Sequence, residues 1–480
     1  MKPAVPALSL VLLAGAALAA PADRSKPPAS GPVKPLKLPP VQRLALVNGL
    51  PVLLVESHEV PVASVVLVVR TGAAADPLEK PGLASFTAAM LEEGAGGRGS
   101  LALDDVLSFL GADLSTGSSW DSSTVSLHVP VSRLEAALPL MADVALRPDF
   151  PESELKRLKK EALTALLQAR SEPRQIASRA FAKAVFGDTQ RYGLPAGGNA
   201  RSIAAFTTGE LRAFHRAWYR PGNAALIAAG DLKPGTLLPL LEKAFGSWEA
   251  GGSPSASLPL PPQVKGRNIW LVDKPGAAQS LIRAGRVGPD RRTPDYADLE
   301  VMNTLLGGSF TSRLNDNLRE QHGYAYGARS FFDYRRSAGV FLALADVQSK
   351  VTGEAMSEFM KELERIRTPA TAAEVERARN YLALRFPEEF ETTRQIAGKL
   401  ATQFVYGLPA DTWDTFVPKA LAVGAGPLQK AAAAQVDTKN MAIVIVGDRS
   451  VVEKPLRALN LGEIRVLSVE DVMGPPPAVD

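Results

Sequence analysis

The residue types that most often do chemistry in proteins are scarce in this chain. It contains no Cys and only four His among its 480 residues. Without Cys there is no disulfide, no thiol nucleophile and no Cys-based zinc site. The imidazoles belong to His58, His128, His215 and His322. No two of them fall within one helical turn, so no helix presents a pair of His ligands on one face.

Length and composition indicate a folded protein with more than one domain. A chain of 480 residues exceeds what one hydrophobic core normally holds. Its 46% hydrophobic and 22% charged residues are typical of globular proteins and exclude a disordered chain. The formal net charge is +4, an excess too small to indicate a nucleic-acid partner.

The amino-terminal residues have the pattern of a targeting segment. Lys2 provides a positive start, an apolar run follows from Leu8 to Ala20, and Ala17-Leu18-Ala19 is a small-x-small cleavage site. These features predict a signal peptide over residues 1–19. The run is too short to span a bilayer, so we expect no membrane span and an exported protein, periplasmic or secreted. Residues 20–40 are rich in Pro and are predicted to be a linker.

Three short segments each occur twice in the chain, in the same order and roughly 210 to 220 residues apart, which indicates a duplicated unit. They are Arg-Gln-Ile-Ala at 174–177 and 394–397, the apolar run into Gly-Asp at 225–231 and 442–448, and helix-like segments ending at Gly94 and Gly307. A Gly/Ser/Pro-rich stretch at 250–265 lies between the copies. We therefore predict two similar domains, 41–249 and 266–480.

Hydrophobic periodicity in the first copy predicts clustered strands and helices that do not alternate strictly. Asn48-Gly49 is a strong hairpin turn signal. The predicted strands are 44–47, 51–55, 62–70, 122–129 and 224–230, and the predicted helices are 82–93, 102–110, 131–146, 152–170, 174–186 and 208–218. This order favours an α+β fold of two homologous α/β-sandwich domains, each a mixed, mostly antiparallel sheet covered by helices.

Four segments together resemble the pitrilysin/insulinase family of zinc metallopeptidases. The segment Gly82 to Gly94, after a strand ending in Arg70-Thr71-Gly72, is similar to the zinc-binding segment of that family. The segment from Phe214-His215 to Asn223 is similar to the end of its first domain. In the second copy, Leu305 to Leu314 and Leu318 to Tyr326 are similar to a Gly-rich loop followed by an Arg/Tyr pair. The resemblance covers residues 41 to 470.

The chain departs from the family at the zinc site itself. Active members read His-x-x-Glu-His on this helix and supply a further Glu from a later helix. The corresponding positions here are Ser85, Ala88, Ala89 and Ala165. A catalytic zinc needs three protein ligands and one open position for water. We therefore expect no metal in this chain, although Glu92, Glu93 and Glu161 lie nearby in sequence.

The second-domain residues of the family pattern are present. The resemblance implies that Arg319 and Tyr326 hydrogen-bond the substrate carbonyl and its oxyanion in the site of a partner chain. It also implies that the Gly-rich loop, Gly307, Gly308 and Ser309, binds substrate, with an exposed sheet edge holding an extended peptide.

Simpler interpretations of these residues remain open. Ser85, Ala88 and Ala89 can be small residues that allow close helix packing. Arg319 and Tyr326 can be a surface ion-pair Arg and a half-buried Tyr. The two glycines can be a helix stop.

Two classes of function follow. In the first, the chain is a non-catalytic subunit of a heteromeric zinc endopeptidase, similar to the partner subunits of mitochondrial processing peptidase and of bacterial paired-chain relatives. It would form a heterodimer or higher assembly with a catalytic paralogue that keeps His-x-x-Glu-His and holds the zinc, and it would act on peptides. In the second, it is an exported peptide-binding or scaffold protein without a role in proteolysis.

Overall fold

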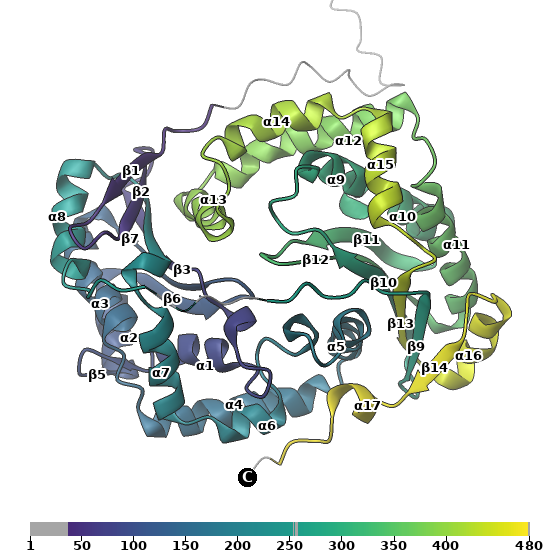
Figure 1. The fold of residues 1–480 in the computed structure, drawn as a ribbon, viewed down its shortest axis with the longest axis horizontal. Helices are drawn as coiled ribbons and strands as arrows, with labels where there is room; N and C mark the ends of the chain where they lie inside the picture. Colours follow the sequence, from purple (N-terminus) through teal and green to yellow (C-terminus); the bar gives the residue numbers. More distant parts are fainter. Residues whose placement is uncertain (1–36, 253, 255–257, 479–480) are drawn as a thin grey trace, which may run out of the picture. The chain divides into compact units, whose positions relative to one another are not determined.

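The structure is a computed structural model, and it describes residues 37–252, 254 and 258–478. The predicted signal peptide 1–19, most of the predicted linker 20–40 and part of the predicted linker 250–265 lie outside the described residues. The described residues pack together as one unit, so contacts between distant segments can be followed (Figure 1).

Six strands from the first half of the chain form one sheet. β2 and β8 run parallel, and the other neighbouring pairs are antiparallel. The spatial order is β1 (Gln42–Ala45), β2 (Pro51–Glu56), β8 (Ala224–Gly230), β3 (Val62–Val69), β7 (Ser123–Pro130) and β6 (Asp113–Ser118). Asn48-Gly49 makes the β1–β2 turn as predicted, with Gly49 at a φ of +81° that suits glycine.

The second half forms another six-stranded sheet with a closely related order. Its strands, taken from the opposite edge, are β14 (Ile464–Leu467), β9 (Arg267–Asp273), β13 (Met441–Gly447), β10 (Gln279–Gly288), β12 (Gly339–Gln348) and β11 (Ala325–Asp333). β9 and β13 are parallel like β2 and β8, whereas β14 is parallel to β9 where β1 is antiparallel to β2. The predicted α+β class with two homologous, mixed, mostly antiparallel sheets is confirmed. The two sheets differ at one edge strand, which is β1 in the first sheet and β14 in the second.

Helices cover both sheets. Those of the first half are α1 (Leu83–Met90), α2 (Ser100–Leu110), α3 (Leu134–Leu146), α4 (Glu152–Ala169), α5 (Pro173–Phe186), α6 (Ala200–Ala205), α7 (Thr208–Trp218) and α8 (Pro234–Phe245). Those of the second half are α9 (Tyr296–Asn303), α10 (Arg313–Asn315), α11 (Thr352–Arg365), α12 (Ala372–Arg385), α13 (Thr393–Tyr406), α14 (Thr412–Ala422), α15 (Ala425–Gln435), α16 (Arg449–Ala458) and α17 (Val469–Met473).

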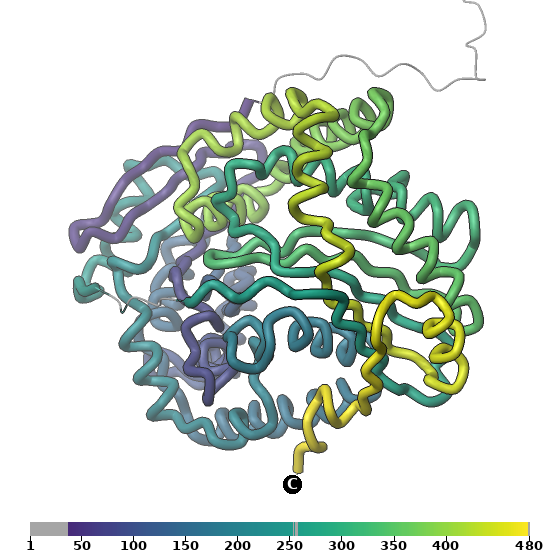
Figure 2. The backbone as a smooth tube through the Cα atoms, turned by 45° about the vertical axis from the view of Figure 1, so that its right-hand side comes forward, coloured from purple at the N-terminus to yellow at the C-terminus, as the bar shows by residue number. Residues whose placement is uncertain are grey.

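The repeated Arg-Gln-Ile-Ala opens two helices that the halves exchange. α5 comes from the first half but packs on β10 and β13, and α13 comes from the second half but packs on β3 and β8. Ile176 and Ala177 are buried in a core with strands of the second sheet. Ile396 and Ala397 are buried in a core with strands of the first sheet. Figures 1 and 2 show α13 beside the first sheet and α5 beside the second. Each sheet is thus covered on one face by a helix of the other half.

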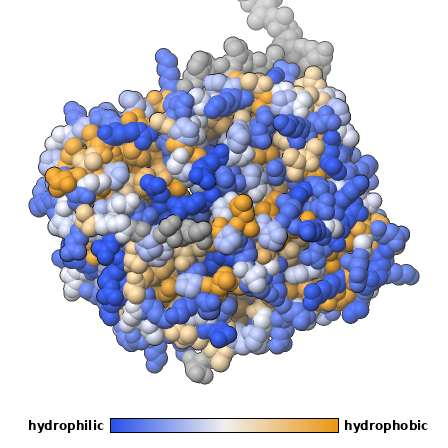
Figure 3. Space-filling model, in the orientation of Figure 1, coloured by the Kyte–Doolittle hydropathy of each residue, from blue (hydrophilic) through white to orange (hydrophobic). Residues whose placement is uncertain are grey.

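No helix among the described residues is both long enough and apolar enough to cross a membrane. Figure 3 shows hydrophilic residues over most of one face, with hydrophobic residues in smaller groups between them.

His215 on α7 gives this fold a testable pH dependence. Its side chain is 8% exposed, and its Nε2 lies 2.9 Å from the carbonyl oxygen of Ala145. Burial lowers the pKa of His215 from 6.5 to about 4, so the unfolded chain takes up a proton at pH 5 to 6 that the folded chain does not. The folded state therefore loses stability as the pH falls from 6.5 towards 4, by about 3 kcal/mol in total.

His215→Gln keeps a hydrogen-bond donor near Ala145 and removes this titration. Urea unfolding at pH 7, 5 and 4 should show a free energy of unfolding that falls about 3 kcal/mol less in the variant than in the native chain. Parallel pH curves for the two proteins would contradict the assignment.

Candidate functional site

Helix α1, where the zinc motif of active family members would lie, is fixed at its start by a buried carboxylate. Gly82 has a φ of +95° immediately before the helix, and a Cβ there would come within 2.6 Å of Gly198. Asp76 accepts hydrogen bonds from the backbone N–H groups of Gly82 and Ala84, each at 2.8 Å. Arg191 donates to the same carboxylate at 2.7 Å. Asp76 therefore fixes the start of this helix, although the helix carries no zinc-ligating side chain.

Two of the four degenerate positions, Ser85 and Ala88, make contacts inside the chain. Ser85 donates a 2.9 Å hydrogen bond to the carbonyl oxygen of Ala196. Ala88 is buried, and Thr116 of β6 donates to its carbonyl oxygen at 2.8 Å. Ala89 and Ala165 are exposed. A hydroxyl and three methyl groups do not fit a zinc ion, because a methyl group has no lone pair to donate.

The acidic residues near α1 are already paired. Arg157 on α4 contacts Glu93 at 2.5 Å, Glu154 at 2.7 Å and Glu161 at 2.8 Å. Glu92 accepts a hydrogen bond from the backbone N–H of Thr116. In the described part of the chain no group of three or more His, Cys, Asp or Glu is arranged to hold a metal ion. The described residues therefore provide no zinc site.

The His residues lie in separate environments. His58 is exposed and its ring contacts Asp231 at 2.6 Å, and His128 Nδ1 lies 2.9 Å from Ser64 Oγ. His215 is buried on α7, and His322 stacks on Tyr324 with their ring centroids 4.9 Å apart. None of these contacts brings two imidazoles together.

A cavity of about 840 Å³ opens against the second sheet. The predicted substrate-binding residues Gly307, Gly308 and Ser309 line it, and so does Tyr326, one of the two predicted catalytic residues. The remaining lining residues come from α5, β10, α10, β11, β12, α12 and the loop before α10. They are Arg174, Gln279, Arg283, Phe310, Asn315, Gly327, Ala328, Arg329, Ser330, Phe331, Leu344, Asp346, Tyr381 and Arg385. Because Arg174 belongs to the exchanged helix α5, both halves of the chain build this cavity.

Arg319 and Tyr326 are brought together beside the cavity. The guanidinium carbon of Arg319 lies 5.2 Å from the ring centroid of Tyr326 and 4.7 Å from that of Phe310. Its Nε contacts Glu320 at 3.2 Å. Tyr326 is 87% exposed, so the predicted half-buried Tyr of the simpler interpretation is wrong. Two exposed rings against a guanidinium form a preorganised donor site, because Arg favours stacking on aromatic faces.

The two glycines serve packing inside the chain. Gly307 belongs to a π-helical segment, Thr304–Gly308, and a Cβ there would lie 2.2 Å from the backbone nitrogen of Ser330 on β11. A Cβ at Gly308 would lie 2.9 Å from Nδ2 of Asn303. Ser309 donates to the carbonyl oxygen of Thr304 at 3.2 Å. Close approach to strand β11 therefore accounts for Gly307 without a substrate.

Part of the β11 edge is also occupied by the chain itself. Oδ1 of Asn315 accepts a 3.2 Å hydrogen bond from the backbone N–H of Ala328. β11 is the edge strand of the second sheet, so this bond replaces one that an added strand would make. A bound peptide therefore has less free edge here than the sequence interpretation assumed.

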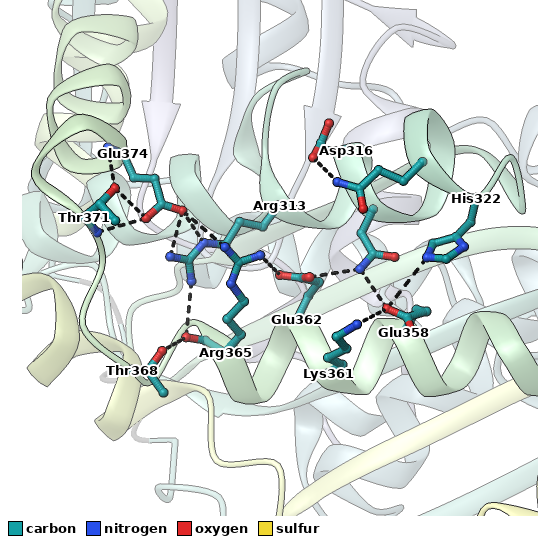
Figure 4. A network of polar contacts seen from close by, with 12 residues as sticks. Arg313, Asp316, His322, Glu358, Lys361, Glu362, Arg365, Thr368, Thr371 and Glu374 are labelled. Carbon is teal, nitrogen blue, oxygen red and sulfur yellow. Dashed lines mark hydrogen bonds and ion pairs between the residues drawn. The ribbon is translucent and has the colours of Figure 1, made fainter.

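A polar network that sequence reasoning missed holds the segment bearing Arg319 (Figure 4). Arg319 lies in a second π-helical segment, Asp316–Gln321, a type of helix that occurs often at functional sites. Nδ2 of Asn317 in this segment donates to Glu358 and to Glu362 of α11, each at 2.9 Å. Just before it, Arg313 donates to Glu374 of α12 at 2.9 Å. These bonds tie the start of the Arg319 segment to α11 and the residues just before it to α12.

Sequence signals for this network and for the cavity arginines were weak. Arg283 stands between apolar neighbours in strand β10 and is nearly fully buried, which is the kind of buried charge that indicates a partner. The polar residues of 313–322 are evenly spread and show no helical or strand period, so no pattern assigns them a role.

The fold and the site define a class of protein: a two-domain α+β protein built like a metallopeptidase, whose helix at the zinc position carries none of the zinc ligands. Comparison with known families agrees. Residues 51–194 match the family described as insulinase (peptidase family M16), and residues 205–382 match the one described as peptidase M16 inactive domain. Together these ranges take up more than half of the chain. The chain belongs to the insulinase family, peptidase family M16.

Similar proteins come from several bacteria. An uncharacterized zinc protease of Mycobacterium leprae is 27% identical over 66% of this chain and 75% of its own. The non-peptidase homolog YmxG of Helicobacter pylori is 23% identical over 75% of this chain and 83% of its own. The crystal structure of a peptidase M16 inactive domain from Pseudomonas fluorescens matches with a TM-score of 0.79 and 27% identity, over 85% of this chain and 98% of that one.

Proposed function

We propose that this chain is the non-catalytic subunit of a heteromeric zinc endopeptidase and lends substrate-binding and transition-state-stabilising residues to a partner that holds the zinc. One observation carries the proposal: the chain has no zinc ligand on α1, yet it keeps Arg319 and Tyr326 together beside a large cavity. An exposed guanidinium held against aromatic rings suits hydrogen bonding to a substrate carbonyl.

The geometry supports a defined role for Arg319. Its guanidinium is held by the rings of Phe310 and Tyr326 and has one ion-pair partner among the described residues, Glu320. Nitrogens not used by Glu320 can donate to a peptide carbonyl oxygen, and the phenol of Tyr326 is a further donor. Donors fixed before the reaction stabilise the oxyanion that forms when water attacks the carbonyl carbon. Chemistry at the metal belongs to the partner.

The second candidate is an exported peptide-binding or scaffold protein. It is favoured by the contacts at Ser85 and Ala88, each of which is hydrogen-bonded to another segment of the first domain, and by the name non-peptidase homolog given to one relative. Export itself is a proposal that rests on the pattern of residues 1–19.

Reconstitution separates the two candidates. Co-expression with a paralogue that keeps His-x-x-Glu-His should yield a stable complex that contains zinc and cleaves unfolded peptides, whereas each chain alone should be nearly inactive. Zinc content and peptide cleavage are measured on the purified complex. The matched control is the same complex with the motif Glu of the paralogue changed to Gln, which should assemble but not cleave. Full cleavage by the paralogue alone would contradict the proposal.

A further inference from the structure

The cavity beside Tyr326 carries an excess of positive charge. Its lining residues include four arginines, Arg174, Arg283, Arg329 and Arg385, and one acidic residue, Asp346. The whole chain has a formal net charge of only +4, so this is a local concentration and not a reflection of overall composition.

Asp346 does not cancel this charge. Its Oδ2 accepts from Nε of Arg174 at 3.1 Å, and its Oδ1 accepts from Nη1 of Arg283 at 3.1 Å. Both oxygens of one carboxylate are thus shared by two guanidinium groups, which leaves the trio with a net positive charge. Arg283 is nearly fully buried, so its charge is poorly screened by water.

The other two arginines of the cavity lining are exposed. Arg329 is exposed on β11, and none of the described residues forms an ion pair or a side-chain hydrogen bond with it. It lies near enough to Arg283 for the two charges to repel each other. Arg385 is 59% exposed, donates to the hydroxyl of Tyr381 at 3.0 Å and reaches Glu388 only at 3.6 Å.

We infer that this cavity selects peptides through carboxylate groups, so that the substrate class of the site is an acidic peptide segment. Arg groups bind carboxylates with two parallel hydrogen bonds. The exposed rings of Phe310 and Tyr326 and the half-buried ring of Tyr381 line the same cavity and offer apolar contact to neighbouring side chains. The carboxylate is either an Asp or Glu side chain or a C-terminal carboxylate. The inference rests on the proposed function, because it names the class of substrate that the same site would bind.

Binding to the full chain without a partner tests the inference. Fluorescence anisotropy is measured with three labelled 12-residue peptides that differ only in having Glu, Gln or Lys at four positions. The Glu peptide should bind at least about tenfold more tightly than the Lys peptide at low salt, and the difference should shrink as NaCl is raised. C-terminally amidated and free-acid versions of the Gln peptide show whether side chains or the C-terminus supply the carboxylate.

Variants locate the effect. Arg329→Gln combined with Arg385→Gln should abolish most of the preference, because it removes two exposed charges without breaking a buried pair. Arg457→Gln is the matched control: Arg457 is 50% exposed on α16, outside the cavity, and its loss should leave the preference intact.

Three results would overturn the inference: equal binding of the Glu and Lys peptides, an unchanged preference in the double variant, or tighter binding of a single-stranded oligonucleotide that the same variant abolishes. Because binding is measured on this chain alone, failure of the reconstituted peptidase leaves the inference standing. Conversely, loss of the acidic preference leaves cleavage by the complex as a separate question.

Discussion

Alanine in place of Arg319 should lower kcat of the reconstituted complex by about 10²- to 10³-fold while leaving assembly and zinc content unchanged. Removal of a preorganised donor to an oxyanion costs that much because the donor acts mainly in the transition state. The side chain stacks on two exposed rings and has one exposed ion pair, so its truncation should disturb the fold little. Steady-state kinetics, with metal analysis and size-exclusion chromatography of each variant, check the prediction.

Glu320→Gln is the matched control, because it removes the ion pair of Arg319 but keeps the donor. It should retain kcat within about twofold, since an exposed ion pair contributes at most about 1 kcal/mol. Tyr326→Phe removes only the hydroxyl, and its kcat should lie between those of Arg319→Ala and Glu320→Gln. Turnover of Arg319→Ala within twofold of the native complex would remove the proposed role of Arg319 and favour the scaffold function.

The elements with strong local signals were predicted well from sequence. The predicted helix 208–218 matches α7, Thr208–Trp218, because Thr207 and Glu210 form a capping box that fixes its start. The predicted strand 224–230 matches β8, in which all residues are buried. The helix predicted over 82–93 ends earlier, at Met90, where the chain turns into the short strand β4 (Gly94–Ala95).

Other elements lacked a local signal. β6, with the sequence Asp-Leu-Ser-Thr-Gly-Ser, was missed because an edge strand with one fully buried side chain shows no alternation. The repeated segment at 174–177 and 394–397 indicated duplication but not the exchange of α5 and α13. Which sheet a helix covers depends on packing between segments far apart in sequence, and periodicity identifies only the face that is buried.

Only part of the candidate site was predicted from the sequence. The resemblance placed Arg319 and Tyr326, and the structure brings them together, while their roles stay predictions. The cavity arginines come from α5, β10, β11 and α12, so no sequence window contains them. Asn317 was missed because an amide that bridges two carboxylates on another helix has no sequence signature.

The pair formed by Asp76 and Arg191 should make a large contribution to stability. Their side chains are 0% and 2% exposed, and two further nitrogens of Arg191, Nε and Nη1, have no hydrogen-bond partner. Burial raises the pKa of Asp76, while Arg191 and the backbone amides of Gly82 and Ala84 oppose that rise. Arg191→Met keeps much of the side-chain volume but leaves the carboxylate without its counter-charge, which typically costs about 3 to 5 kcal/mol.

The loss should depend on pH in a direction that identifies its cause. Without Arg191 the pKa of Asp76 rises further above its unfolded value, so the folded variant holds a proton that the unfolded chain releases. Its stability is then retained at low pH and lost as the pH rises, and the deficit relative to the native chain should be larger at pH 8 than at pH 5. Urea unfolding at the two pH values measures it.

The double variant Asp76→Asn, Arg191→Met is the control, since it removes both charges and leaves an amide oxygen near the start of α1. It should be less destabilised than the sum of the single variants, because neither charge is then buried alone. A loss below about 1 kcal/mol for Arg191→Met, equal at both pH values, would show that α1 does not depend on this pair. The expected result would instead explain why a helix without its ligands keeps its place: the charge pair at its start, and not a bound metal, holds it.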